Sequence, residues 1–166
     1  MMKPLEITTP SDTELRILRE VDAPQDLVWD TWTQPALVAR WMLGPPGWTM
    51  PVCEMDLRVG GAWRYVWRKN HGEEMEMTGK YLEVTPTSRL VSTERWGPQW
   101  PETIIVVELV EKDGRTTIIQ TVQYPSKEAR DAATRTGMAE GLEQSYQRID
   151  ALLASLRAGG TAAAGA

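Results

Sequence analysis

The sequence predicts an α+β domain in which a curved antiparallel sheet of about seven strands wraps around a long C-terminal helix. Short segments of alternating apolar and polar residues, separated by turn residues, recur between positions 14 and 124. Apolar residues then recur every three to four positions between 138 and 156, which is typical of an amphipathic helix. A chain of 166 residues suits one domain with its own core.

The N-terminal part predicts an arm, a strand and two short helices. Residues 1–13 are expected to form a flexible arm, and the alternation over 14–21 predicts the first strand. Pro24 suits the first turn of a helix, and Pro35 suits the start of a second one. The Gly and Pro residues of 44–47 end that second helix.

The middle of the chain has the pattern of strands joined by short turns. Asn70-His71-Gly72 and Lys112-Asp113-Gly114 are typical hairpin turns. Short turns join antiparallel neighbours, so the sheet is expected to be mainly antiparallel. With the first strand, the expected strands cover residues 14–21, 52–59, 63–68, 75–81, 90–96, 103–110 and 116–124.

The last helix is expected to start after Ser126, which suits an N-cap. Gly137 and Gly141 are poor helix formers, so they predict a kink or a close approach to the sheet. Residues 158–166 are rich in Gly and Ala and are expected to be a disordered tail. The single folded domain is therefore expected to span residues 14–157.

The composition excludes several classes of function. A net charge of −5 without any basic stretch argues against nucleic acid and against an anionic membrane surface. Cys53 is the only cysteine and His71 the only histidine, so neither a disulfide nor a Cys- or His-rich metal site is expected, and no cofactor is predicted. No apolar run reaches transmembrane length and no signal peptide is evident, so a cytoplasmic protein is expected by default.

The same architecture predicts space between sheet and helix. A helix is about 10 Å across, too narrow to cover a seven-stranded face. The chain has eight Trp, four Tyr and no Phe, so large rings would face that space. The walls of an apolar pocket are predicted to be Trp41, Trp63, Tyr65, Trp67, Met75, Met77, Tyr81, Trp96, Met138, Leu142 and Tyr146. Alternatively, these residues simply fill the core.

Several segments resemble those of a known family. They are Val21-Asp-Ala-Pro-Gln-Asp-Leu-Val-Trp-Asp-Thr-Trp32, Arg40-Trp41, Gly44-Pro45, Val52 to Tyr65, Gly79-Lys-Tyr-Leu-Glu-Val84, Arg89-Leu-Val91, Tyr124-Pro-Ser126 and Gly137-Met138. Together they resemble the bacterial AHSA1-type SRPBCC proteins, related to the activator of Hsp90 ATPase within the START-like (Bet v 1-like) superfamily. The resemblance implies a helix-grip fold but no chemistry, because relatives include lipid carriers, hormone receptors, cyclases, hydrolases and co-chaperone domains.

Two departures from the family pattern concern the predicted pocket. Relatives often carry Trp where this chain has Leu142, which would free volume if the position faces the pocket. They usually carry apolar residues where this chain has Ser92 and Glu94, and Gln120 interrupts another apolar strand face. If these faces point inward, the pocket holds a hydroxyl, a carboxylate and an amide. The alternative is a one-residue bulge that turns Glu94 to solvent.

Three hypotheses for function follow. The first is binding of an apolar or aromatic small molecule, oriented by Ser92, Glu94 and Gln120. The second is a small enzyme, similar to a cyclase or hydrolase, with Glu94 or His71 as acid or base. The position of His71 in a predicted turn argues against a catalytic role, because a solvated histidine is more usual there. For Cys53, a buried structural thiol is the favoured interpretation.

The third hypothesis is a protein-interaction module like the co-chaperone relatives. It requires an exposed apolar patch on the outer face of the sheet, and Arg64 and Arg68 argue against such a patch. A homodimer through an edge strand is a further expectation that the sequence leaves open.

Overall fold

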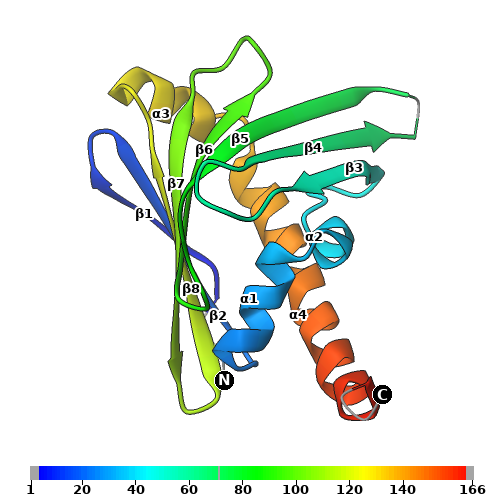
Figure 1. The fold of residues 1–166 in the computed structure, drawn as a ribbon. Coiled ribbons are helices and arrows are strands. Elements are labelled where there is room, and N and C mark those ends of the chain that lie inside the picture. The colour runs from blue at the N-terminus through cyan, green and yellow to red at the C-terminus, as the bar shows by residue number, and fades with distance from the viewer. Residues whose placement is uncertain (1–3, 71, 164–166) are drawn as a thin grey trace.

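The structure is a computed structural model that describes residues 4–70 and 72–163. An eight-stranded antiparallel sheet, in the order β1-β2-β8-β7-β6-β5-β4-β3, curves around the C-terminal helix (Figure 1). This confirms the predicted fold class. The strands are β1 (Glu6–Ser11), β2 (Glu14–Val21), β3 (Trp48–Met55), β4 (Ala62–Lys69), β5 (Glu74–Thr85), β6 (Arg89–Trp96), β7 (Thr103–Lys112) and β8 (Arg115–Gln123). The helices are α1 (Gln25–Thr33), α2 (Pro35–Trp41), α3 (Lys127–Thr134) and α4 (Met138–Ala163).

The sheet has one strand more than the seven predicted. This additional strand is β1, at the edge of the sheet beside β2. The prediction of a flexible arm over residues 1–13 is wrong for residues 6–11, and residues 1–3 lie outside the described residues. All six residues of β1 are exposed, so no apolar alternation marks the strand in the sequence. Backbone pairing with β2, for example Glu6 with Leu18, holds it in place.

The predicted strand over residues 52–59 is shifted in the structure, because β3 ends at Met55. Residues 56–61 form a tight turn instead, and Val59 is 66% exposed. Gly61 explains the turn, since a Cβ there would lie 2.0 Å from the Asp56 carbonyl oxygen. Asp56 and Arg58 form an exposed ion pair at 2.9 Å in this turn.

The C-terminal helical region is divided in two. The Ser126 hydroxyl accepts a hydrogen bond from the backbone of α3, which confirms the predicted N-cap. Gly137, at φ +81°, separates α3 from α4, which confirms the predicted kink at this glycine. The helix α4 extends to Ala163 and so overlaps the predicted disordered tail over residues 158–163; residues 164–166 lie outside the described residues.

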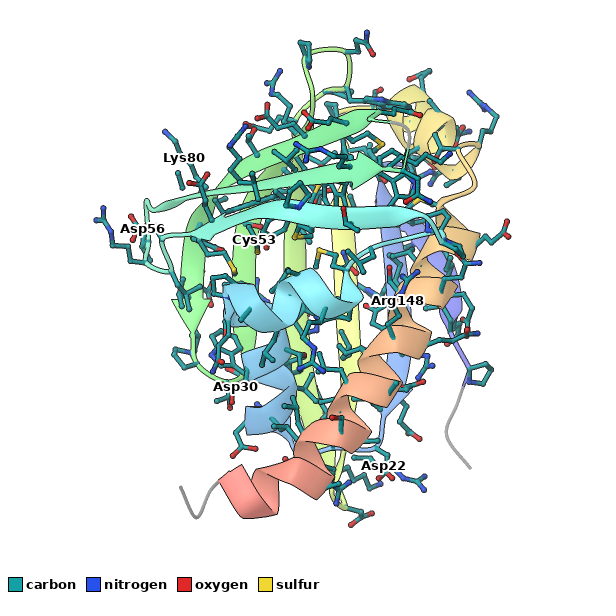
Figure 2. All side chains as sticks on the ribbon, turned by 90° about the vertical axis from the view of Figure 1, so that its right-hand side faces the viewer. Asp22, Asp30, Cys53, Asp56, Lys80 and Arg148 are labelled. Carbon is teal, nitrogen blue, oxygen red and sulfur yellow. The ribbon has the colours of Figure 1, made fainter. Side chains whose placement is uncertain are left out.

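The core lies between the concave face of the sheet and the helices (Figure 2). In β2 every second residue is buried, including Leu15 and Ile17. Arg19 shares this inner face and is only 7% exposed, and its guanidinium pairs with Asp150 of α4 at 2.5 Å. Among the described helices, none is long and apolar enough to cross a membrane.

Candidate functional site: an aromatic cavity

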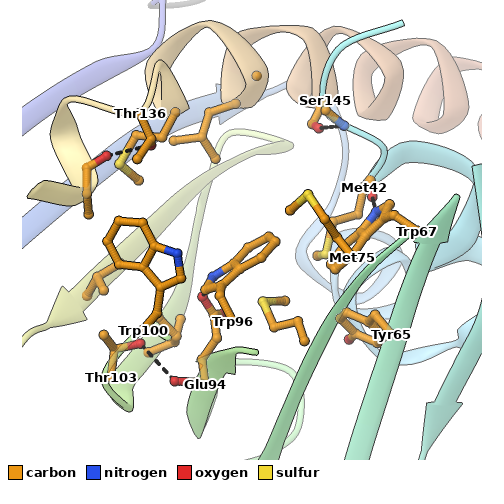
Figure 3. Close-up of a pocket in the computed structure, with 18 of the residues that line it drawn as sticks. Met42, Tyr65, Trp67, Met75, Glu94, Trp96, Trp100, Thr103, Thr136 and Ser145 are labelled. Atoms are coloured by element: carbon orange, nitrogen blue, oxygen red, sulfur yellow. Dashed lines mark hydrogen bonds between the residues drawn. The ribbon is translucent and has the colours of Figure 1, made fainter. Parts of the chain in front are cut away.

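A cavity of about 870 Å³ opens between the inner face of the sheet and helices α2 and α4 (Figure 3). Its volume is within the range of small-molecule sites in proteins. Every residue predicted to face a ligand lies on its wall: Trp41, Trp63, Tyr65, Trp67, Met75, Met77, Tyr81, Ser92, Glu94, Trp96, Gln120, Met138, Leu142 and Tyr146. That these residues bind a ligand stays a prediction.

Aromatic side chains are concentrated at the cavity. Seven of the eight tryptophans and all four tyrosines of the chain line it, and Trp29 is the exception. Sequence reasoning missed Trp32, Trp48, Trp100 and Tyr124, which lie in α1, in β3, in the β6–β7 loop and after β8. The sequence feature that could have identified them is the composition, with eight Trp and no Phe.

Hydrogen bonds and ring contacts fix several of these side chains. The indole N–H groups of Trp41 and Trp67 donate to the backbone oxygens of Thr31 and Met42, each at 2.7 Å. The ring of Trp67 stacks on that of Trp96, with centroids 5.2 Å apart and planes at 12°. The wall is therefore built before any ligand binds, which lowers the entropic cost of binding.

Three other donors on the wall have no hydrogen-bond partner in the described protein. They are the indole N–H groups of Trp32 and Trp63 and the hydroxyl of Tyr81. The residues that carry them are 7%, 5% and 2% exposed, respectively. Native proteins rarely leave buried donors unpaired, but each of these three atoms exposes less than 1 Å² of surface, so the donors are enclosed within the wall and do not open into the cavity.

The predicted polar row of Ser92, Glu94 and Gln120 faces the cavity. Strand β6 pairs with β7 in continuous register from Arg89 to Glu94, so the alternative of a bulge that turns Glu94 outward is wrong. The Tyr146 hydroxyl donates to the Gln120 side-chain oxygen at 3.3 Å. Sheet and helix α4 are thus joined by a polar contact inside the cavity.

Among the polar residues of the cavity wall, Glu94 has an unusual environment for a carboxyl group. The Trp96 indole N–H donates to its carboxylate at 2.8 Å, and within the described residues no Lys, Arg or His forms an ion pair with it. Burial raises the pKa of Glu94 to about 7, and the hydrogen bond from Trp96 opposes that rise only in part. A carboxyl group that changes charge near neutral pH therefore lies on the cavity wall.

Glu94→Gln is expected to stabilise the free protein at pH 8 and to leave its stability unchanged at pH 4. A carboxyl group with a raised pKa binds more protons in the folded state, so the free energy of unfolding falls as pH rises from about 4 to about 7. Glutamine removes that loss, a gain of up to about 3 kcal/mol at pH 8. Urea unfolding at both pH values measures it.

The matched control is Glu83→Gln, which changes an exposed ion pair with Arg89 on the same sheet. It is expected to alter stability by less than about 1 kcal/mol at either pH. An equal response of the two variants at pH 8 would contradict the burial of Glu94.

The other residues considered for catalysis or metal binding have less structural support. His71 lies outside the described residues. Cys53 is half-buried in β3, and burial raises the pKa of its thiol to about 11, which makes it a poor nucleophile at neutral pH. In the part of the chain that the structure describes, no group of three His, Cys, Asp or Glu side chains could hold a metal ion.

Known structures share this architecture. A crystal structure of a Rhodobacter sphaeroides protein is 31% identical, has a TM-score of 0.89, and covers 93% of this chain and 100% of its own. A crystal structure of a Nitrosomonas europaea protein is 27% identical, with a TM-score of 0.80 and coverages of 90% and 99%. A solution structure of the AHSA1-like protein from Aeromonas hydrophila is 21% identical, with a TM-score of 0.66 and coverages of 82% and 93%.

A search of curated proteins finds no match to the sequence. One family profile does match, over residues 22–154, and it describes activator of Hsp90 ATPase homolog 1-like proteins. The matched region runs from the end of β2 into α4 and includes most of the cavity wall. On this evidence the chain belongs to the family of activator of Hsp90 ATPase homolog 1-like proteins.

Proposed function

We propose that the protein binds an apolar or aromatic small molecule in the cavity between the sheet and α4. The observation that carries the proposal is a cavity of about 870 Å³ walled mainly by Trp, Tyr and Met side chains. Burial of apolar ligand surface there would supply about 25 cal/mol per Å². Family and fold are consistent with a ligand-binding domain in general.

Apolar residues that belong both to the cavity wall and to the exposed surface would give such a molecule a route inward. Met75, Trp96 and Trp100 line the cavity, yet they are 41%, 37% and 37% exposed. Exposed large apolar side chains grouped at an opening are typical of binding sites. An apolar ligand would lose contact with water gradually as it passes them.

The neutral fluorophore N-phenyl-1-naphthylamine tests the proposal. It is expected to bind with one-to-one stoichiometry and to increase its emission, because the cavity is apolar. Leu142→Trp replaces an aliphatic side chain of the wall with a larger indole ring, and it is expected to weaken binding about fivefold or more. Fluorescence titration measures both effects.

Leu82→Trp is the matched control, because Leu82 is 48% exposed and is not part of the cavity wall. It should bind the probe as the unchanged protein does. If the fluorophore fails to bind the unchanged protein, or if both variants weaken it equally, the proposed site is wrong.

A second candidate function is catalysis in the same cavity, favoured by Glu94 alone. A carboxyl group with a pKa near 7 is suited to give or take a proton at neutral pH. Glu94→Gln separates the two candidates: an enzyme would keep binding its substrate and lose turnover, whereas a carrier or sensor has no turnover to lose.

The co-chaperone-like alternative has weaker structural support. On the outer face of the sheet, Arg64 pairs with Glu76 at 2.6 Å and reaches Glu54 at 3.5 Å. Arg68 pairs with Glu74 at 2.6 Å on the same face. A charged face of this kind lacks the apolar patch that a docking protein requires.

A further inference from the structure

The charges around the cavity are of one sign. Among the residues that the structure describes, no Lys, Arg or His lines the wall, whereas Glu74, Glu76 and Glu94 do. Glu74 and Glu76 are paired with Arg68 and Arg64 on the outer face. Glu94 is therefore the acidic group on the wall whose charge no basic side chain of the described chain offsets.

An anionic ligand would fit this cavity poorly. A carboxylate or sulfonate would need a basic partner to offset the loss of its hydration, and the described wall offers none. It would also lie in the same cavity as the Glu94 carboxyl group. A ligand with a positive group meets the opposite situation, because the charge of Glu94 compensates for its desolvation.

The aromatic rings next to Glu94 favour a cation as well. Trp96 donates its N–H to Glu94, and the ring of Trp96 is supported from one side by Trp67. Trp96 and Trp100 remain partly exposed on the same wall as Glu94 (Figure 3). The π-faces of indole rings attract ammonium groups, and the attraction is greater where water is excluded.

We infer that the ligand of this cavity is an organic cation: an apolar or aromatic body with a protonated amine that pairs with Glu94 beside Trp96. This inference rests on the proposed function, because it names the ligand class for the same cavity. The apolar body lies against the aromatic wall.

If the amine pairs with the ionised form of Glu94, the affinity for the amine must depend on pH. The other groups that face Glu94 are Tyr65 of β4 and Tyr124 after β8; burial raises the pKa of Tyr65 well above its ordinary value and that of Tyr124 to about 12. Both stay neutral below pH 8. Between pH 5.5 and 8 Glu94 loses its proton, so the affinity for an amine rises about tenfold with pH.

Three probes with one ring system test the inference: 2-(1-naphthyl)ethylamine, 2-(1-naphthyl)ethanol and 1-naphthylacetate. At pH 8, calorimetric titration is expected to give the amine an affinity about tenfold or more above that of the alcohol. The acetate is expected to bind more weakly than the alcohol. In Glu94→Gln the preference for the amine falls to within about threefold, its pH dependence disappears, and the affinity for the alcohol is retained.

Glu83→Gln serves again as the control and should keep the preference for the amine, since Glu83 is not part of the wall. If the amine binds no more tightly than the alcohol, or if Glu94→Gln retains the full preference, the inference is overturned. In that case binding of N-phenyl-1-naphthylamine leaves the proposed function standing. Failure of all four compounds to bind overturns both.

Discussion

Gly79→Ala is expected to destabilise the protein by about 3 kcal/mol or more, or to prevent folding. Gly79 lies in β5, and a Cβ atom there would be 1.9 Å from the backbone oxygen of Thr93 in β6. It would also be 2.5 Å from two ring atoms of Trp63, whose indole packs over the glycine. Neither neighbour can move cheaply, because one is strand backbone and the other is a buried ring. Thermal and urea unfolding measure the loss.

Gly141→Ala is the matched control, since its new Cβ would lie at an ordinary contact distance of 3.6 Å from Pro45. In the first turn of α4, alanine is expected to leave stability unchanged or to add up to about 1 kcal/mol. A Gly79→Ala variant within 1 kcal/mol of the unchanged protein would contradict the close packing of Trp63 on β5.

Asp150→Ala is expected to cost about 3 kcal/mol of unfolding free energy. It removes the partner of Arg19, whose guanidinium is bonded to Asp150 in the core and also lies 5.9 Å from the ring centroid of Tyr146. The penalty arises because a charge that is almost fully buried is left without its counter-ion. Chemical denaturation measures the change.

Replacing both partners, as in Arg19→Met with Asp150→Leu, is expected to recover most of that loss, because no charge then remains buried. Glu76→Ala, in an exposed ion pair with Arg64, is expected to cost less than about 1 kcal/mol. If Asp150→Ala costs no more than Glu76→Ala, the buried pair does not matter for stability.

Much of the fold could be predicted because its patterns are local. Trp63, Tyr65 and Trp67 share one face and alternate with Arg64, Val66 and Arg68, a strand signal that needs no knowledge of the rest of the chain. The strand β1 gave no such signal, since neither of its faces is buried. The end of β3 was missed because Leu57 and Val59 continue the alternation past the point where Gly61 forces a turn.

The residues of the cavity wall could be predicted where they lie in strands, because successive side chains of a strand point to opposite faces of the sheet. Ser92 and Glu94 face inward because alternation from Leu90 continues without a bulge. Trp100 was missed because it lies in a loop, where no period determines direction. Arg19 was missed as a core residue because its partner is 131 positions away in the chain, a separation that no local pattern reports.

The concentration of tryptophan around the cavity gives the protein a built-in optical reporter. With Trp29 as the exception, the chain's indoles line the cavity, so nearly all of its ultraviolet emission originates at the surface that a ligand would touch. A bound molecule would alter the polarity around these indoles or accept their excitation energy. Occupancy can thus be followed without a label in the unmodified chain.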